Sequence, residues 1–231
     1  MLRAVLFDLD DTLIDQASAA AGAVVAWAKE HGITDPDVTN RWARVSETQY
    51  ARYARRELTF AQMRRERVRG FLAVEVDDYR ADEIFAGYLD RYEAGWVAFD
   101  DAVPTLRRAR AVGLKVGVLT NGDEDQQRYK LDRLGLTNEI DVLIASSILP
   151  AGKPDRRAFT HAIEHLGVDA AEALMVGNSL DQDVLGALAV GLSAVLLDRD
   201  DVHVTVRVPR IRSLHELDFS RPRPTTQGVS S

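Results

Sequence analysis

The feature that most constrains the fold is a recurrence of short apolar runs separated by segments with helical periodicity. The runs are largely apolar and do not alternate with polar residues, which is typical of strands covered on both faces. Helical segments between such strands favour a parallel α/β sheet. The five predicted strands are Ala4–Leu9, Lys115–Leu119, Asp141–Ala145, Ala173–Val176 and Ser193–Leu197.

The segments between the predicted strands differ in length. The later ones are short and contain helices that begin near an acidic residue and end at glycine, as helices prefer. These helices are expected at Asp123–Gly135, Asp155–Gly167 and Asp181–Gly191, whereas Ala102–Gly113 is expected to be the crossover helix that ends the first segment. The first segment has about a hundred residues, whereas a parallel crossover needs only a dozen or so.

This long first segment has helical periodicity and no clear strand signal. Helices are expected over 16–31, 37–56 and 80–92, and a further helix after Thr59, where Thr59 and Gln62 fit a capping box. The sequence therefore predicts an all-helical module, residues 16–97, inserted in a Rossmann-like doubly wound core made of residues 1–15 and 98–219. The tail, residues 220–231, is rich in Pro, Ser and Thr and is expected to be disordered.

Composition excludes several functional classes. The chain has no cysteine, so disulfide scaffolds, thiolate zinc sites and cysteine nucleophiles are ruled out. A net charge of −7 disfavours a nucleic-acid partner, because affinity for phosphate backbones comes from Lys and Arg. The N-terminus lacks a signal-peptide pattern and no apolar run is long enough to cross a membrane, so we expect a cytoplasmic protein without a membrane partner. The oligomeric state stays open.

Polar residues follow four of the predicted strands, where an open parallel sheet carries its reactive groups. Asp8 and Asp10 follow the first strand and point the same way, and two adjacent carboxylates are costly unless a cation such as Mg²⁺ offsets them. A carboxylate beside a metal can attack phosphorus while a neighbouring carboxyl protonates the leaving oxygen. Thr120 with the Asn121 turn, and Lys153, would then bind the phosphate oxygens.

The four strand-end motifs together resemble those of the haloacid dehalogenase superfamily, in its phosphatase branch with a helical cap in the first insertion position. They occupy residues 7–13, 119–122, 152–155 and 177–183. The resemblance implies that Asp8 is the nucleophile and a metal ligand, and that Asp10 is the general acid/base whose backbone carbonyl also meets the metal. It further implies phosphate binding by Thr120 and Lys153.

The fourth motif departs from the pattern, because Asn178 stands where many members have Asp. Its amide oxygen can still bind Mg²⁺, so the predicted metal ligands are Asp8, Asp10, Asn178 and Asp183, with one negative charge fewer and weaker expected affinity. The hypothesis is a Mg²⁺-dependent phosphatase that acts on a small phosphorylated metabolite. A phosphomutase of the same family, or a noncatalytic binding member motivated by Asn178, are the alternatives.

Two residue groups also have plainer interpretations. The acidic residues after the first strand could cap the helix that begins at Gln16. An arginine-rich stretch of the insertion could form solvated ion pairs, or could attract an anionic substrate. These arginines are Arg52, Arg55, Arg56, Arg64, Arg65, Arg67 and Arg69.

Overall fold

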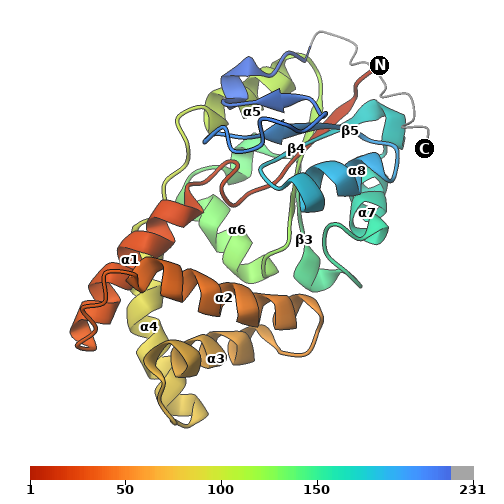
Figure 1. The fold of residues 1–231 in the computed structure, drawn as a ribbon. Coiled ribbons are helices and arrows are strands. Elements are labelled where there is room, and N and C mark those ends of the chain that lie inside the picture. Colours follow the sequence, from red (N-terminus) through yellow and green to blue (C-terminus); the bar gives the residue numbers. More distant parts are fainter. Residues whose placement is uncertain (220–231) are drawn as a thin grey trace. The chain divides into compact units, whose positions relative to one another are not determined.

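The computed structural model of the 231-residue chain describes residues 1–219, which divide into two compact units (Figure 1). One unit is Met1–Ile14 with Ala98–Ser231, described as far as residue 219, and the other is Asp15–Val97. The tail at 220–231, expected to be disordered, lies outside the described residues. Among residues 1–219, no helix is both long and apolar enough to cross a membrane.

The first unit is built on a six-stranded sheet with strand order β3-β2-β1-β4-β5-β6. Every neighbouring pair is parallel, which confirms the predicted α/β class. The sixth strand was not predicted, because its two residues include an arginine and form no apolar run. The strands are β1 (Ala4–Phe7), β2 (Lys115–Thr120), β3 (Val142–Ala145), β4 (Ala173–Gly177), β5 (Ser193–Leu197) and β6 (Arg210–Ile211).

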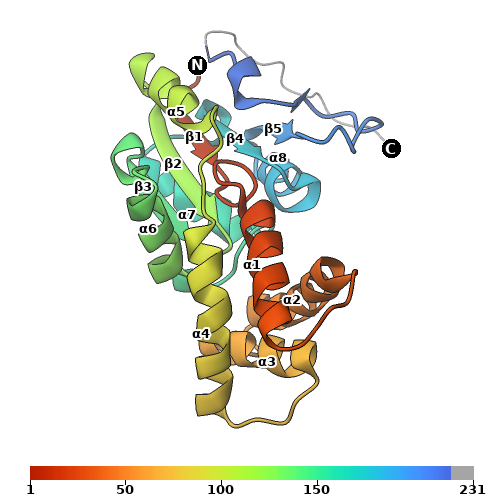
Figure 2. The same ribbon diagram turned by 90° about the vertical axis from the view of Figure 1, so that its left-hand side faces the viewer.

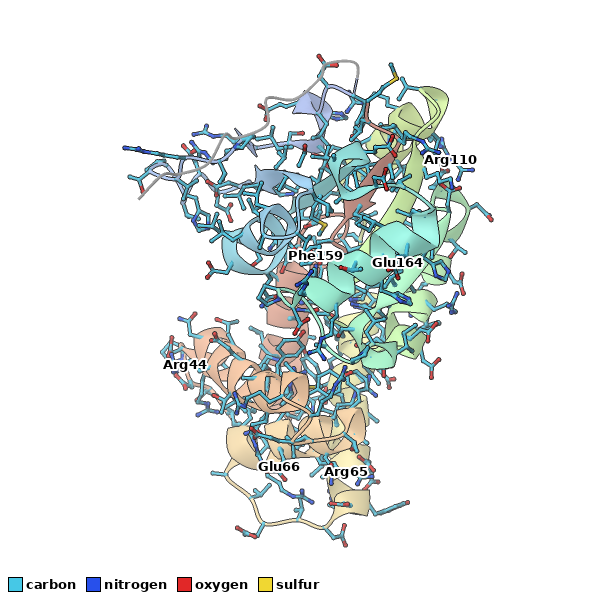
Figure 3. All side chains as sticks on the ribbon, turned by 90° about the vertical axis from the view of Figure 1, so that its right-hand side faces the viewer. Arg44, Arg65, Glu66, Arg110, Phe159 and Glu164 are labelled. Atoms are coloured by element: carbon cyan, nitrogen blue, oxygen red, sulfur yellow. The ribbon has the colours of Figure 1, made fainter. Side chains whose placement is uncertain are left out.

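Helices cover both faces of this sheet, which explains why its first five strands are largely apolar. Val5 and Phe7 of β1 belong to the core that also contains α5 (Ala102–Ala111) and α6 (Glu124–Arg133). The alternate residues of β1 point to the opposite core, with Phe159 of α7 (Arg156–Leu166) and with α8 (Gly186–Leu188) (Figures 1 and 3). Successive side chains of a strand point to opposite faces of the sheet, so each face has its own apolar core and its own layer of helices.

The second unit contains four helices, which Figure 2 shows in a second orientation. They pack around an aromatic cluster of Trp27, Trp42, Phe71 and Tyr88, all buried. The Trp27 indole N–H donates to the carbonyl of Ile84 at 3.1 Å, so the cluster also satisfies its polar atom. The helices are α1 (Gln16–Glu30), α2 (Val38–Ala54), α3 (Phe60–Leu72) and α4 (Asp78–Ala94).

The helix ends confirm part of the capping prediction. Thr59 and Gln62 form the expected capping box at the start of α3. The residue that caps α1 is Asp15, which accepts from the N–H of Ser18 at 3.0 Å. The acidic residues Asp8 and Asp10 are therefore not used as caps of α1.

The helix predicted over 181–191 is present, but it begins as a π-helix and is shorter than expected. The chain forms a π-helical segment, Leu180–Leu185, followed by the short α8. The Ser179 side chain accepts from the N–H of Gln182, and the wider turn buries both Asp183 and Val184. Single π-turns are frequent at functional sites because they redirect side chains.

Arginines of the insertion are largely engaged within it. Arg65 binds Asp78 and Asp82, and Arg69 binds Glu66 and Asp78. Figure 3 labels Arg65 and Glu66 on α3. These partly exposed pairs favour the interpretation of this stretch as ion-paired helix surface.

Candidate active site

Polar side chains from four strand ends meet at one edge of the sheet. The sheet order places β1 between β2 and β4: β2 and β3 lie on one side of β1, and β4, β5 and β6 lie on the other. Such a switch point is where open α/β sheets bind ligands, beyond the carboxyl ends of the strands. Asp8 follows β1 directly, and its N–H donates to the carbonyl of Val176 in β4 at 2.9 Å.

A buried lysine joins two carboxylates at this edge. The Lys153 Nζ lies 2.6 Å from Asp8 Oδ1 and 2.6 Å from Asp183 Oδ1. The Lys153 side chain is only 2% exposed. The second oxygen of Asp183 accepts from the N–H of Ser179 at 3.0 Å. The predicted residues Asp8, Lys153 and Asp183 are thus brought together, with Asp183 held by Lys153 and by its own loop.

The charged groups of this cluster shift one another's pKa values. Burial, which disfavours the charged form, raises the pKa of the Asp8 carboxyl to about 7, although Lys153 acts in the opposite direction. The Asp183 carboxylate adds to the rise. Burial alone would lower the pKa of Lys153, but Asp183 and Asp8 raise it above its ordinary value. Lys153 therefore stays a fixed positive charge, and it is shared between two acids.

Asp8 and Asn178 turn side-chain oxygens towards the same point. The Thr12 hydroxyl lies 3.0 Å from Asp8 Oδ2, to which it donates, and 3.4 Å from Asn178 Oδ1. Two of the four predicted metal ligands, Asp8 and Asn178, thus lie within 3.4 Å of the Thr12 hydroxyl. The two residues converge because Asp8 directly follows β1 and Asn178 directly follows the neighbouring β4.

Asn121 organises the loop that carries Lys153. Its amide Nδ2 donates to the Lys153 carbonyl at 2.7 Å, and its Oδ1 accepts from the Lys153 N–H at 2.7 Å. The same amide also donates to Gln182 Oε1 at 3.2 Å. The Asn121 side chain therefore fixes the backbone of Lys153, while phosphate binding by the backbone N–H groups of the Asn121 turn stays a prediction.

Thr120 ends β2 with its hydroxyl inside the site. The hydroxyl oxygen accepts from the N–H of Gly122 at 3.2 Å and from Gln127 Nε2 at 2.9 Å. Because the oxygen acts as the acceptor in both hydrogen bonds, the hydroxyl can still donate its own proton to another acceptor. The Thr120 side chain is accordingly able to donate, and Gln127 links it to Asp10.

Asp10 is held by two residues that the sequence analysis did not assign to the site. Gln127 Nε2 donates to Asp10 Oδ2 at 2.7 Å, and Lys130 Nζ makes an ion pair with Asp10 Oδ1. Both residues lie on α6, directly after the Thr120 motif. A usable signal was present, because Lys130 is one of only four lysines and stands three residues after Gln127, on the same helix face.

Three motif glycines are required by close packing. A Cβ on Gly177 would lie 2.2 Å from Asp183 Oδ2, and one on Gly152 would lie 2.4 Å from Asn121 Oδ1. A Cβ on Gly122 would meet the Gln127 side chain at 2.2 Å. Glycine at these positions lets the polar side chains approach the strand ends.

The oxygen donors of the site suit Mg²⁺ better than a softer metal. Among residues 1–219, no three His, Cys, Asp or Glu side chains gather into a group that could hold a metal ion. Mg²⁺ does not need such a group, because it typically takes one or two carboxylates and completes its shell with water and phosphate oxygens. The Asp8 carboxylate and the Asn178 amide oxygen, which converge on Thr12, fit that requirement.

Comparison with known proteins identifies the class of this chain. It belongs to the haloacid dehalogenase-like hydrolases, whose family model matches residues 2–191. It is a hydrolase with a Rossmann-like core and a helical cap inserted between β1 and β2.

Two similar proteins of known activity are phosphatases. The chain is 30% identical to a glyceraldehyde 3-phosphate phosphatase from Methanopyrus kandleri, over 86% of this chain and 85% of that protein. It is 32% identical to a ribulose-1,5-bisphosphate 5-phosphatase from Halopiger xanaduensis, over 95% of each.

Solved structures share the fold. The putative HAD-hydrolase YfnB from Bacillus subtilis, solved with magnesium, has a TM-score of 0.75 and 22% identity, and the match covers 93% of this chain and 96% of that one. A 2-haloacid dehalogenase from Pseudomonas syringae has a TM-score of 0.69 and 26% identity, covering 93% and 95%. The fold thus serves both phosphatases and dehalogenases, and the site must separate them.

Proposed function

We propose that this hydrolase is a Mg²⁺-dependent phosphatase that cleaves a small phosphomonoester through an aspartyl-phosphate at Asp8. The observation that carries the proposal is the buried Asp8 carboxylate that follows β1 and pairs with Lys153, together with the Thr120 hydroxyl that Gln127 links to Asp10. A carboxylate, a fixed cation and a hydroxyl donor are the groups that phosphoryl transfer needs.

In the first step, a carboxylate oxygen of Asp8 attacks phosphorus, and the bond from phosphorus to the ester oxygen breaks. The carboxyl group of Asp10 gives its proton to that oxygen, so the alcohol leaves neutral. Lys153 and Thr120 bind the phosphoryl oxygens and offset their charge.

In the second step, water attacks the phosphorus of the aspartyl-phosphate and gives a proton to the Asp10 carboxylate. The bond between phosphorus and the Asp8 oxygen breaks, which restores the Asp8 carboxylate and releases inorganic phosphate. The sum is one ester and one water converted to one alcohol and one phosphate.

Asp8 and Asn178, with the backbone carbonyl of Asp10, would hold the magnesium ion. When bound, the ion neutralises charge on the phosphate and favours the ionised form of Asp8. Asp183 contributes through Lys153, because its oxygens accept from Lys153 and from the N–H of Ser179.

Asp10 favours phosphoryl transfer over dehalogenation. An alkoxide leaving group needs a proton, whereas a halide does not, so an acid two residues after the nucleophile is useful only to the first reaction. The relatives with phosphorylated substrates support the same choice, and we propose a small phosphorylated metabolite as the substrate.

The test is an assay of the parent protein and of Asp8→Asn against a panel of phosphomonoesters, with and without a chelator. We expect Mg²⁺-dependent release of phosphate by the parent and none by the variant. Full activity of Asp8→Asn would contradict the nucleophile, and activity in the chelator would contradict the metal. No turnover by either the parent or Asn178→Asp, over the whole panel, would instead support a binding role. Transfer of the phosphoryl group to a second hydroxyl of the same substrate would support a mutase.

A further inference from the structure

Two side chains of α6 hold the proposed acid/base group, and no motif of the sequence assigned them a role. Gln127 and Lys130 stand three residues apart on the same face of the helix. Both are buried, and the Lys130 side chain is 1% exposed, whereas that of Asp10 is 22% exposed. The helix thus presents two buried donors to a partly exposed carboxylate.

Each oxygen of Asp10 has its own donor from this helix. Lys130 Nζ pairs with Oδ1, and Gln127 Nε2 donates to Oδ2 at 2.7 Å. One donor would leave the carboxylate free to rotate about its terminal bond, but two donors on different oxygens fix its plane.

Gln127 also connects Asp10 with the phosphate-binding side. Its Nε2 lies 2.7 Å from Asp10 Oδ2 and 2.9 Å from the Thr120 hydroxyl oxygen. Both amide hydrogens are used by these two acceptors. The Asp10 carboxyl is therefore held close to the hydroxyl that is proposed to bind the phosphoryl group.

The other end of the Gln127 amide supports the same conclusion. Its Oε1 is buried and has no hydrogen-bond partner among the described residues. A buried acceptor without a donor is unfavourable, and native structures contain few of them. The amide is nevertheless oriented with Nε2 towards Asp10 and Thr120, so these two hydrogen bonds outweigh the unfavourable position of Oε1.

We infer that Gln127 and Lys130 are positioning residues, which hold the Asp10 carboxyl where it transfers a proton to and from the ester oxygen. The inference rests on the proposed phosphatase reaction. A competing explanation is that Lys130 only anchors α6 to the loop after β1. The two explanations differ in how the leaving group should affect the rate.

Misplacing a general acid slows esters with poor leaving groups and spares esters whose leaving group departs without a proton. The test therefore compares kcat/KM for an alkyl ester, glycerol 3-phosphate, with that for p-nitrophenyl phosphate, since this ratio covers the steps up to alcohol release. Lys130→Met keeps the length of the side chain and removes its charge. Lys115→Met is the matched control, because the Lys115 ammonium donates to the Leu166 carbonyl, and Lys115 begins β2, at the opposite end of that strand from Thr120.

We expect Lys130→Met to lower kcat/KM for the alkyl ester by about 10- to 100-fold and for the aryl ester by less than about 3-fold. Gln127→Leu should show the same split, and Lys130→Arg should restore part of the alkyl activity. Lys115→Met should change both substrates equally and by less than about 2-fold. Thermal melts establish that each variant folds, and Gln127→Leu carries the test if Lys130→Met does not fold.

Equal losses for both substrates in Lys130→Met and Gln127→Leu, or no loss, would overturn the positioning role. A parent protein without phosphatase activity, or an Asp8→Asn variant as active as the parent, would instead overturn the proposed function. The two failures are therefore distinguishable.

Discussion

Replacing Asp101 by Asn should destabilise the core unit, because Asp101 accepts hydrogen bonds from three residues in two separate segments of the chain. Its Oδ2 accepts from Arg199 Nη1 at 2.9 Å, from the Ser213 hydroxyl at 2.7 Å and from the N–H of Leu214 at 2.9 Å. Its Oδ1 accepts from Arg199 Nη2 at 2.9 Å. The same Arg199 nitrogen donates to the carbonyl of Thr12, whose side chain contacts the active site.

The magnitude follows from this geometry. An Asn amide that places its oxygen at the Oδ2 position keeps three bonds, but its NH₂ group then faces Arg199 Nη2, and that bond is lost. One bond to a charged group contributes about 1.5 to 3 kcal/mol. Arg199, which is partly buried, also loses its counter-ion. We therefore expect the free energy of unfolding to fall by about 2 to 4 kcal/mol at pH 7.

The loss should depend on pH. Burial acts to raise the pKa of Asp101, but the hydrogen bonds from Arg199, Ser213 and Leu214 outweigh it and hold the pKa below its ordinary value. The unfolded chain therefore takes up the proton first as the pH falls. The stabilisation is complete above the unfolded pKa of about 4 and disappears as the pH falls through the folded pKa.

Urea denaturation followed by circular dichroism, at pH 7 and at several values below 4, measures the difference between parent and variant. Glu139→Gln is a suitable control, because its carboxylate pairs with a largely exposed arginine, Arg107, and should change stability by less than about 1 kcal/mol. A loss below about 0.5 kcal/mol in Asp101→Asn at pH 7, or a loss that persists unchanged at pH 3, would refute the reasoning.

Three further changes test the site. Lys153→Met should abolish phosphate release in a steady-state assay, because the variant lacks the cation that pairs with Asp8 and Asp183 and is proposed to bind the phosphoryl oxygens. A thermal melt establishes that the variant folds, and substantial activity of the folded variant would contradict the role of Lys153. Asn178→Asp restores a carboxylate and should lower the Mg²⁺ concentration for half-maximal activity by about 10-fold, and an unchanged or higher value in a metal titration would argue against Asn178 as a ligand. Gly177→Ala places a Cβ 2.2 Å from Asp183 Oδ2, so the melting temperature and the activity should both fall. A variant that keeps the parent values of both would contradict this packing argument.

The fold was largely predictable because its signals are local. A strand buried on both faces must be apolar throughout, and β1 and β5 show this directly in the sequence. Helix ends were visible where capping chemistry sets them, as at Thr59. The edge strand β6 was missed because two residues carry no periodicity, and the π-turn at Leu180–Leu185 was missed because its shape depends on burying Asp183 against Lys153.

The site was predictable only where residues follow strands in recognisable motifs. Asp8, Thr120 and Lys153 are examples, since each stands at or near a strand end whose position the topology fixes. Gln127 and Lys130 gave weaker signals, because a helical residue could face solvent or the site and only the packing of α6 decides between them. The engagement of Asn121 with the Lys153 backbone is likewise a contact between distant segments that spacing alone does not reveal.

The most direct test of the account is to trap the phosphorylated enzyme. The parent protein would be mixed with excess phosphomonoester and Mg²⁺, quenched in acid within one turnover, digested and analysed by mass spectrometry. The account predicts an acid-stable, base-labile phosphate on the peptide that contains Asp8, and none in Asp8→Asn. Turnover of the ester with no phosphate on that peptide at any quench time, or with the phosphate on another residue, would contradict it.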